Sequence, residues 1–204
     1  MIASSKRFHQ DRPITAVEPI SCFHETVGRI LAENQEALRL VDAAAVDGLI
    51  QRIRAAPRLF AVGEGRSGLV IRMAAMRMIH LGREAHVVGE ATAPAIAAGD
   101  LLLAISGSGT TRFVVEVAES ARKAGAAVVA LTTQAGSPLA READFTVILP
   151  AACKLDHGKG RSRQFAGSQF EQASLILWDA IFDMMARENS QGDETLWSRH
   201  TNLE

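Results

Sequence analysis

Five short apolar segments after residue 57 limit the possible folds more than any other feature of this sequence. They read RLFAVG (58–63), AHVVG (85–89), LLLAIS (101–106), AAVVALTT (126–133) and FTVILP (145–150). Each has the length of a β-strand, and most are apolar at consecutive positions instead of alternating positions. This pattern is typical of strands buried on both faces, as in a parallel sheet covered by helices.

Helical patterns lie between and around several of these segments. Apolar residues recur with a period near 3.6 in two amphipathic stretches between residues 21 and 55, and again over 67–81, 111–124 and 168–188. Strands that alternate with helices form parallel βαβ units. The sequence therefore predicts an α/β fold, a three-layer αβα sandwich around a five-stranded parallel sheet with extra helices at both ends.

The remaining segments define the expected domain organisation. Residues 1–19 are polar, so we expect a flexible amino-terminal arm there. Residues 151–167 show no periodic apolar pattern and are expected to form a long loop. Residues 20–204 then make a single domain, of which 189–204 form a carboxy-terminal tail.

Composition and charge narrow the class of function. The chain has 204 residues, 48% of them hydrophobic, and a formal net charge of −1, so no long-range field favours nucleic acid or an anionic membrane. Its two cysteines, Cys22 and Cys153, form no C-x-x-C pair. No apolar run approaches the roughly 18 residues of a membrane span. We therefore expect a soluble, cytoplasmic protein that binds neither nucleic acid nor a membrane.

The third apolar segment runs into a loop rich in hydroxyl groups. The loop residues are Ser106, Gly107, Ser108, Gly109, Thr110 and Thr111. Its glycines let backbone N–H groups approach a ligand, and it leads into a helix N-terminus, where the helix dipole favours an anion. No G-K-[ST] motif follows, which excludes a nucleoside triphosphate loop of that kind. The loop is either a plain turn or a cradle for a small phosphate group.

The first apolar segment ends in a second glycine loop. Residues 63–68 read GEGRSG, a literal G-x-G-x-x-G, and Glu90 could be the ribose ligand of a dinucleotide fold. A chain of this length, however, leaves little room for a separate substrate domain. Ser67 places a hydroxyl group at the expected helix N-cap, where a monophosphate could use it equally well. A simple glycine turn is the third interpretation.

Gly65, Arg66 and Ser67 are therefore candidate ligands for a phosphate group. The Arg66 guanidinium could bind a phosphate or an oxyanion, or it could pair with Glu64 or Glu90. Both glycine loops follow the carboxyl ends of predicted parallel strands, where open α/β sheets bind their ligands. We expect the two loops to hold one ligand between them.

The two loops resemble those of the sugar isomerase (SIS) family. The resemblance rests on GEGRSG after the first strand, SGSGTT after the third, and ALTT followed by SPLAREAD after the fourth. Within the family, the chain is most similar to the isomerases of hexulose phosphates. That closer similarity rests on GRSGLVIRMAAMRMIHLG (65–82), VVGEATAPAIAAGDLLLAISGSG (87–109), FEQASLILWDAI (170–181) and RHTNLE (199–204).

The resemblance implies a fold and a reaction. The fold is the flavodoxin-like SIS fold. The reaction interconverts D-arabino-hex-3-ulose 6-phosphate and D-fructose 6-phosphate through an enediol, in the ribulose monophosphate route of formaldehyde fixation. The resemblance also implies a homotetramer, a phosphosugar as the substrate, and neither a metal nor an organic cofactor. Consistent with the last point, no two histidines have the spacing of metal ligands.

The resemblance also assigns roles to particular residues. Those that would hold the phosphosugar are Gly65, Arg66, Ser67, Ser106, Gly107, Ser108, Gly109, Thr110 and Thr111. Glu171 would be the proton-transferring base, and His200, brought by the tail from a neighbouring subunit, a second catalytic or ligand-positioning group. Sequence alone leaves both with an ordinary alternative: Glu171 could complement a helix dipole, and His200 could be a solvated surface residue.

Two other functions stay open at this point. The chain could be another SIS phosphosugar isomerase, acting on arabinose 5-phosphate or sedoheptulose 7-phosphate, or a non-catalytic phosphosugar sensor. A sensor would need an output module, and residues 1–19 are too few for a helix-turn-helix domain. The basic loop 154–163 could place Lys159, Arg161 and Arg163 over the phosphosugar, or it could simply be solvated.

Overall fold

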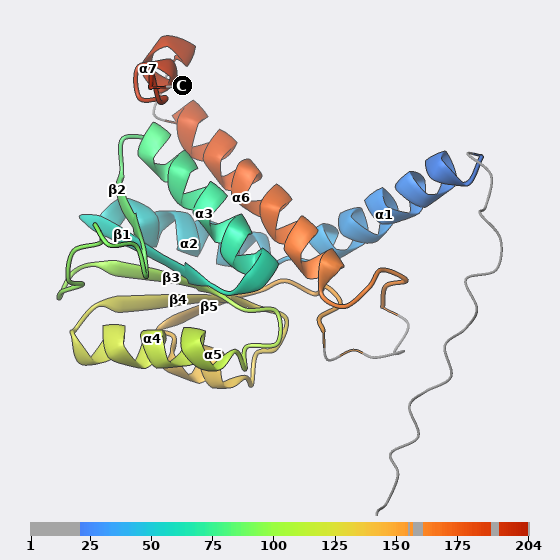
Figure 1. Ribbon diagram of the computed structural model, residues 1–204, viewed down its shortest axis with the longest axis horizontal. Coiled ribbons are helices and arrows are strands. Elements are labelled where there is room, and N and C mark those ends of the chain that lie inside the picture. Colours follow the sequence, from blue (N-terminus) through green and yellow to red (C-terminus); the bar gives the residue numbers. More distant parts are fainter. Residues whose placement is uncertain (1–20, 155, 157–160, 189–191, 204) are drawn as a thin grey trace, which may run out of the picture.

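The chain folds around a sheet with helices on both of its faces (Figure 1). The computed structural model describes residues 21–154, 156, 161–188 and 192–203, so the arm expected at residues 1–19 lies outside the described residues. The helices are α1 (Ser21–Arg39), α2 (Ala43–Ala55), α3 (Gly65–His80), α4 (Arg112–Lys123), α5 (Pro138–Glu142), α6 (Ser168–Glu188) and α7 (Asp193–Trp197). The strands are β1 (Arg58–Gly63), β2 (Glu84–Val87), β3 (Leu101–Ile105), β4 (Ala127–Thr132) and β5 (Phe145–Ile148).

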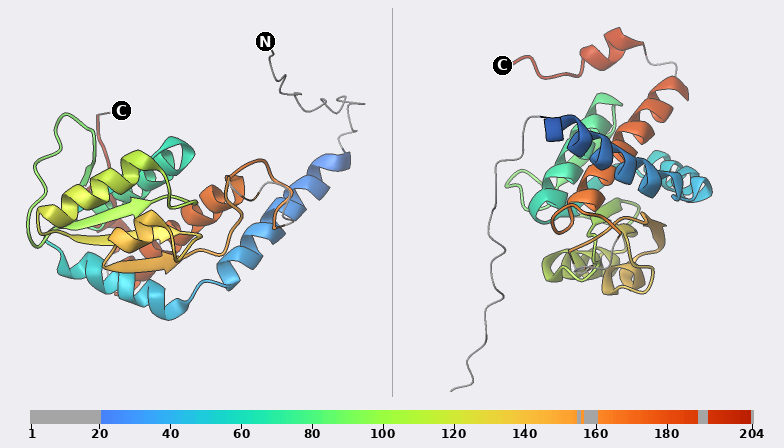
Figure 2. Two further views of the ribbon diagram at one scale, coloured as in Figure 1. Left: turned by 90° about the horizontal axis from the view of Figure 1, so that it is seen from below. Right: turned by 90° about the vertical axis from the view of Figure 1, so that its right-hand side faces the viewer.

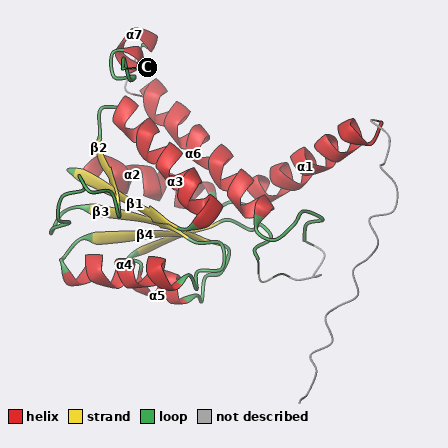
Figure 3. Cartoon of the chain, viewed as in Figure 1, coloured by secondary structure: helices red, strands yellow, loops and turns green. Residues whose placement is uncertain are grey.

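Among the described residues, the strands form one five-stranded sheet in the order β2-β1-β3-β4-β5. All neighbouring strands in it are parallel. Helices α2, α3 and α6 pack on one face and α4 and α5 on the other, drawn in red on either side of the yellow strands in Figure 3. The predicted αβα sandwich with helices added at both ends is therefore confirmed.

Strand β3 explains why the predicted strands are apolar at consecutive positions. Every residue of this strand is buried. Leu101, Leu103 and Ile105 belong to the core on the side of α2, α3 and α6. Leu102 and Ala104 belong to the core on the side of α4. Because successive side chains of a strand point to opposite faces, a strand covered on both sides needs apolar residues throughout.

Helix α1 projects beyond the sheet, as the two views in Figure 2 show. It packs on α6 near Asn34, whose side-chain amide donates a hydrogen bond to Oε1 of Gln172 at 2.7 Å. Farther out, Phe23, Val27 and Leu31 recur every four residues on one side of the helix, and all three are exposed. Even so, none of the helices that the structure describes is long and apolar enough to cross a membrane.

Helix α3 begins earlier than the sequence predicts. It starts at Gly65, and Glu64 occupies the N-cap position, so the expectation of Ser67 as the N-cap residue is wrong. The cause is Gly65, whose φ of +58° lets the chain turn directly from the strand into the helix. The short helices α5 and α7 are not predicted either, because a helix of little more than one turn shows no apolar period.

Candidate active site

The strand order places the two glycine loops next to each other. From β1 the chain crosses to β2 on one side, and from β3 it crosses to β4 on the other. Open α/β sheets bind their ligands where the connections change direction in this way. Gly63 at the end of β1 pairs with Ile105 at the end of β3, so the GEGRSG and SGSGTT loops leave the sheet side by side.

The first loop brings α3 close to the end of β1. A Cβ atom on Gly68 would lie 2.7 Å from the carbonyl oxygen of Gly63, a distance that real Cβ atoms do not adopt. Glu64 stands at the N-cap of α3 but makes no side-chain capping hydrogen bond. The positive end of the helix dipole and the backbone of Gly65 and Ser67 are therefore available to an anion in the pocket.

The second loop is held by pairs of hydroxyl groups. Oγ of Ser106 lies 2.8 Å from Oγ1 of Thr111, and Oγ of Ser108 lies 2.9 Å from Oγ1 of Thr110. Thr111 is the N-cap residue of α4, yet its side chain makes no capping hydrogen bond. A hydroxyl group can donate one hydrogen bond and accept others, so each pair retains capacity for a ligand.

Two glycines shape this second loop. Gly109 has a φ of +62°, and a Cβ atom there would lie 2.1 Å from Oγ of Ser137. A Cβ atom on Gly107 would lie 3.0 Å from Cδ1 of Phe170. The carbonyl oxygen of Gly107 accepts hydrogen bonds from N and Oγ1 of Thr133 at 3.1 and 2.9 Å. Larger residues at either glycine would displace the loop from these partners.

A pocket of about 280 Å³ lies between the two loops and the start of α6. Its lining residues are Glu64, Gly65, Arg66, Ser67, Gly107, Ser108, Thr111, Cys153, Lys154, Ala166, Gly167, Phe170 and Glu171. The pocket thus brings most of the predicted ligand residues together with the predicted base. Ser106, Gly109 and Thr110 contribute to the shape of the second loop instead. The described part of the chain contains no group of three or more His, Cys, Asp or Glu residues that could hold a metal ion.

Glu171 lies in the first turn of α6 and lines the pocket. Its backbone N–H group donates to the carbonyl oxygen of Gly167 at 3.1 Å, and its side chain is only 17% exposed. Nε of Arg66, from the first loop, donates to Oε2 of Glu171. Because the Arg66 side chain is 63% exposed, a ligand in the pocket can reach the guanidinium without displacing packed structure.

The partner of Arg66 corrects one expectation. Arg66 pairs with Glu171 and not with Glu64 or Glu90. The carboxylate of Glu90 instead accepts a hydrogen bond from Nη1 of Arg72 at 2.8 Å. The physical reason is that α6 packs along α3, which brings residues 105 positions apart into contact at the ends of the two helices.

Sequence reasoning missed the walls that the long loop contributes. Cys153 and Lys154 stand at its beginning, Ala166 and Gly167 at its end, and all four line the pocket. This segment has no apolar period, so its path cannot be read from a pattern. The one available signal for its contribution to the pocket was its position in the chain, after β5 and before the helix that carries Glu171.

The basic loop 154–163 also behaves differently from the prediction. Of its described residues, Lys154 is the cation that lines the pocket, whereas Arg161 and Arg163 lie outside the lining. The predicted role of Lys159 falls outside the described residues. Among the residues that the structure describes, Lys154 and Arg66 are thus the positive side chains that line the pocket.

Within its own chain, His200 lies far from this pocket. Its ring stacks on that of His80 at a centroid distance of 5.2 Å and lies 5.1 Å from the ring of Trp197. His80 ends α3, whereas Arg66 is in the first turn of the same helix of 16 residues, a separation of about 20 Å at 1.5 Å per residue. The structure therefore does not bring His200 and Glu171 of one chain together.

Comparison with known proteins identifies the same family that the sequences of the two glycine loops resemble. The SIS domain model matches residues 52–155. The 3-hexulose-6-phosphate isomerase of Mycobacterium gastri is 53% identical over 164 residues, which cover 80% of this chain and 82% of that protein. The enzyme of the same name from Bacillus subtilis is 34% identical over 181 residues, covering 88% of this chain and 98% of its own.

A solved structure agrees with these relatives. The crystal structure of a Methanococcus jannaschii protein, for which a function as 3-hexulose-6-phosphate isomerase was inferred, superposes with a TM-score of 0.76 at 31% identity. The match covers 88% of this chain and 99% of that one. The family model spans about half of the chain, and the relatives extend the similarity over most of the remainder. The chain belongs to the SIS domain family.

Proposed function

We propose that this chain is a 3-hexulose-6-phosphate isomerase, which interconverts D-arabino-hex-3-ulose 6-phosphate and D-fructose 6-phosphate. The observation that carries the proposal is the Glu171 carboxylate, which lines one pocket together with two helix N-termini and the SGSGTT loop. The 3-hexulose-6-phosphate isomerase of Mycobacterium gastri, which is 53% identical to the chain, supports the choice of substrate. The enzyme acts in the cytoplasm, as a single domain over residues 20–204, and uses neither a metal nor an organic cofactor.

The phosphate group of the sugar binds between the two loops. Ser108, Thr111 and Ser67 supply hydroxyl groups, and Gly65 and Gly107 let the backbone come close. A hydrogen bond to a charged group contributes about 1.5–3 kcal/mol net, so four or five of them anchor a phosphosugar against the cost of immobilising it. Lys154 and Arg66 add positive charge at the same pocket.

The chemistry at the other end of the sugar is a proton transfer. A base removes the proton from C2 of the hexulose while O3 takes up a proton, which leaves a 2,3-enediol. O2 then loses its proton as a proton is delivered to C3, which gives the 2-ketose. One carboxylate above the plane of the enediol can serve both carbons. We assign this role to Glu171, which lines the pocket, and the Arg66 guanidinium beside it stabilises negative charge on the enediol oxygens.

The experiment that tests this function compares three substrates. Fructose 6-phosphate formation from D-arabino-hex-3-ulose 6-phosphate, followed by a coupled dehydrogenase assay, should have the highest kcat/KM. Arabinose 5-phosphate and sedoheptulose 7-phosphate should react at least about a hundredfold more slowly, because the distance from phosphate cradle to base is fixed by the protein. Turnover of only one of these two sugars would contradict the proposal. Binding of all three sugars without any turnover would indicate a sensor.

The active enzyme is a homotetramer in which His200 of one subunit completes the site of its neighbour. Apolar side chains exposed on α1 and α3, such as Phe23, Leu31, Leu69 and Met76, support association between copies of the chain. Removing residues 196–204 should lower kcat about a hundredfold, the typical contribution of a general acid, while sedimentation still shows a tetramer. Full activity of the shortened chain would rule out a catalytic tail.

A further inference from the structure

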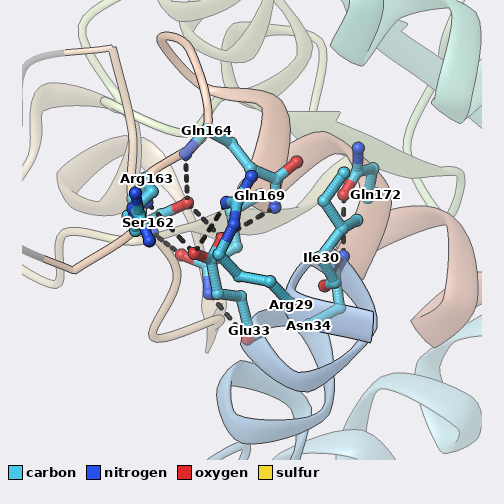
Figure 4. Close-up of polar contacts among 10 residues, drawn as sticks. Arg29, Ile30, Glu33, Asn34, Ser162, Arg163, Gln164, Gln169 and Gln172 are labelled. Atoms are coloured by element: carbon cyan, nitrogen blue, oxygen red, sulfur yellow. Dashed lines mark hydrogen bonds and ion pairs between the residues drawn. The ribbon is translucent and has the colours of Figure 1, made fainter. Parts of the chain in front are cut away.

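Glu33 of α1 binds the long loop through both of its carboxylate oxygens (Figure 4). Oε2 accepts hydrogen bonds from Oγ of Ser162 at 2.6 Å and from Nε2 of Gln164 at 3.0 Å. Oε1 accepts from the backbone N–H of Arg163 at 3.1 Å and from Nη1 of Arg29 at 3.3 Å. One half-buried carboxylate thus holds three consecutive residues of the loop.

The charge of Glu33 matters for this arrangement. Burial acts to raise the pKa of the Glu33 carboxyl, but the hydrogen bonds from Ser162, Arg163, Gln164 and Arg29 together outweigh it and lower the pKa. The side chain is therefore ionised at neutral pH and accepts from all four donors at once. Hydrogen bonds to an ionised acceptor are shorter and stronger than neutral ones.

The same turn of α1 also holds the first turn of α6. Nε2 of Gln169 donates to the backbone carbonyl of Glu33 at 2.7 Å, while Oε1 of Gln169 accepts from the backbone N–H of Ala152 at 2.7 Å. Asn34 donates to Gln172 at 2.7 Å on the other side. Gln169 and Gln172 flank Glu171 in the sequence, so α1 fixes the turn that carries it.

A wall of the pocket lies between residues 162–164, which bind the Glu33 carboxylate, and Gln169, which binds the Glu33 carbonyl oxygen. Ala166 and Gly167 line the pocket, and the carbonyl oxygen of Gly167 accepts from the N–H group of Glu171. Ala166 has a φ of +51°, an uncommon conformation for a residue other than glycine. A residue keeps such a conformation only when the structure on both sides holds it. The carbonyl oxygen of Phe165 accepts hydrogen bonds from N and Oγ of Ser168 at 3.2 and 2.8 Å across this turn, and the contacts of Gln164 and Gln169 with Glu33 attach the turn to α1 on either side.

We infer that Glu33 is a positioning residue of the isomerase: it fixes residues 162–164 and thereby places the Ala166–Gly167 wall and the Glu171 carboxylate against the substrate. Glu33 itself does not line the pocket, so it acts through these residues and not on the sugar. This inference rests on the proposed function, because the residue it positions is the proposed base.

The test replaces Glu33 by Gln and compares it with a matched control. Glu33→Gln keeps the shape of the side chain but turns one acceptor into a donor that faces other donors. It should lower kcat/KM about tenfold, because small displacements of reacting groups are costly. Glu36→Gln, one turn farther on and paired with Arg39 on the exposed face, should leave kcat/KM unchanged. Equal values for the two variants would overturn the inference.

A second variant separates positioning from general destabilisation. Ser162→Ala removes one donor to Glu33 and should lower kcat/KM in the same direction by a smaller factor. The double variant should be no worse than Glu33→Gln alone, because both changes break one contact. Additive losses, or full activity of Ser162→Ala, would count against the role of Glu33. The Ser162→Ala result decides the question even where Glu33→Gln does not fold.

A structural readout keeps this test independent of the substrate. Amide hydrogen exchange of the peptide that covers residues 161–171 should be faster in Glu33→Gln than in Glu36→Gln, because the wall loses its attachment. If the wild-type protein turns over no hexulose phosphate but the exchange rates differ as expected, the proposed function fails and the anchoring role of Glu33 stands. Equal exchange in the two variants would remove that role as well.

Discussion

Replacing Glu171 by Gln should lower the rate of fructose 6-phosphate formation by at least about a thousandfold, within the range that general acid–base catalysis contributes. The amide has the size of the carboxylate but cannot take a proton from C2. The change weakens the contact with Arg66 but leaves the SGSGTT loop and the backbone of the first loop in place. Fructose 6-phosphate should therefore raise the melting temperature of the variant nearly as much as that of the wild type. Steady-state kinetics and thermal unfolding with and without ligand measure the two effects.

Glu64→Gln is the matched control, because Glu64 is the other glutamate that lines the pocket. It stands at the start of α3 and does not contact Arg66 in the way that Glu171 does. We expect its turnover to fall less than tenfold, since it stays outside the proton transfer. Wild-type turnover in Glu171→Gln, or a larger loss in Glu64→Gln, would transfer the role of the base to another group.

Gly109→Ala should be the most destabilising single change in the SGSGTT loop, at a cost of about 3 kcal/mol in the free energy of unfolding. Two effects add here: the left-handed backbone at a φ of +62°, and a Cβ atom 2.1 Å from Oγ and 2.3 Å from Cβ of Ser137. Ser137 caps α5 by accepting from the N–H of Ala140, so relief of the contact displaces either the loop or that helix. Urea unfolding measures the loss.

Gly99→Ala separates the two contributions. Gly99 also has a left-handed backbone, with a φ of +91°, but its Cβ would stand in open space. The free energy of unfolding of this variant should fall by about 1–2 kcal/mol, because only the cost of the left-handed backbone applies, and the variant should keep its activity. Gly109→Ala should lose more and also show weaker binding of fructose 6-phosphate. Equal losses in the two variants would mean that the contact with Ser137 carries no energy.

Most of the fold can be predicted because buried parallel strands leave a strong signal. Leu101 to Ile105 must be apolar throughout, since alternate residues enter the two cores. The long helix Ser168–Glu188 was predictable for a similar reason, because its buried side chains recur with the helical period. The start of α3 was less predictable, since it depends on the backbone conformation of Gly65 and not on any apolar pattern.

The candidate site could be predicted only in part. The two loops carry a local signal, because glycines and hydroxyl groups follow strands at the ligand-binding end of a sheet. The contact of Arg66 with Glu171 leaves no local signal in the sequence, because it depends on how α3 and α6 pack. The role of Glu33 is harder still to predict. In the sequence it is one of several charged residues of an amphipathic helix, and only the fold brings it into contact with Ser162.

In the proposed mechanism, a proton leaves C2 of the hexulose phosphate for an enzyme carboxylate and a proton is delivered to C3. The most direct test is the conversion of D-arabino-hex-3-ulose 6-phosphate in D₂O, with the product analysed by NMR. The wild-type product should be fructose 6-phosphate that carries deuterium at C3, because a carboxyl proton exchanges with solvent between the two steps, and Glu171→Gln should form almost no product. Product formed at the wild-type rate by Glu171→Gln would contradict the assignment of the proton transfer to this carboxylate.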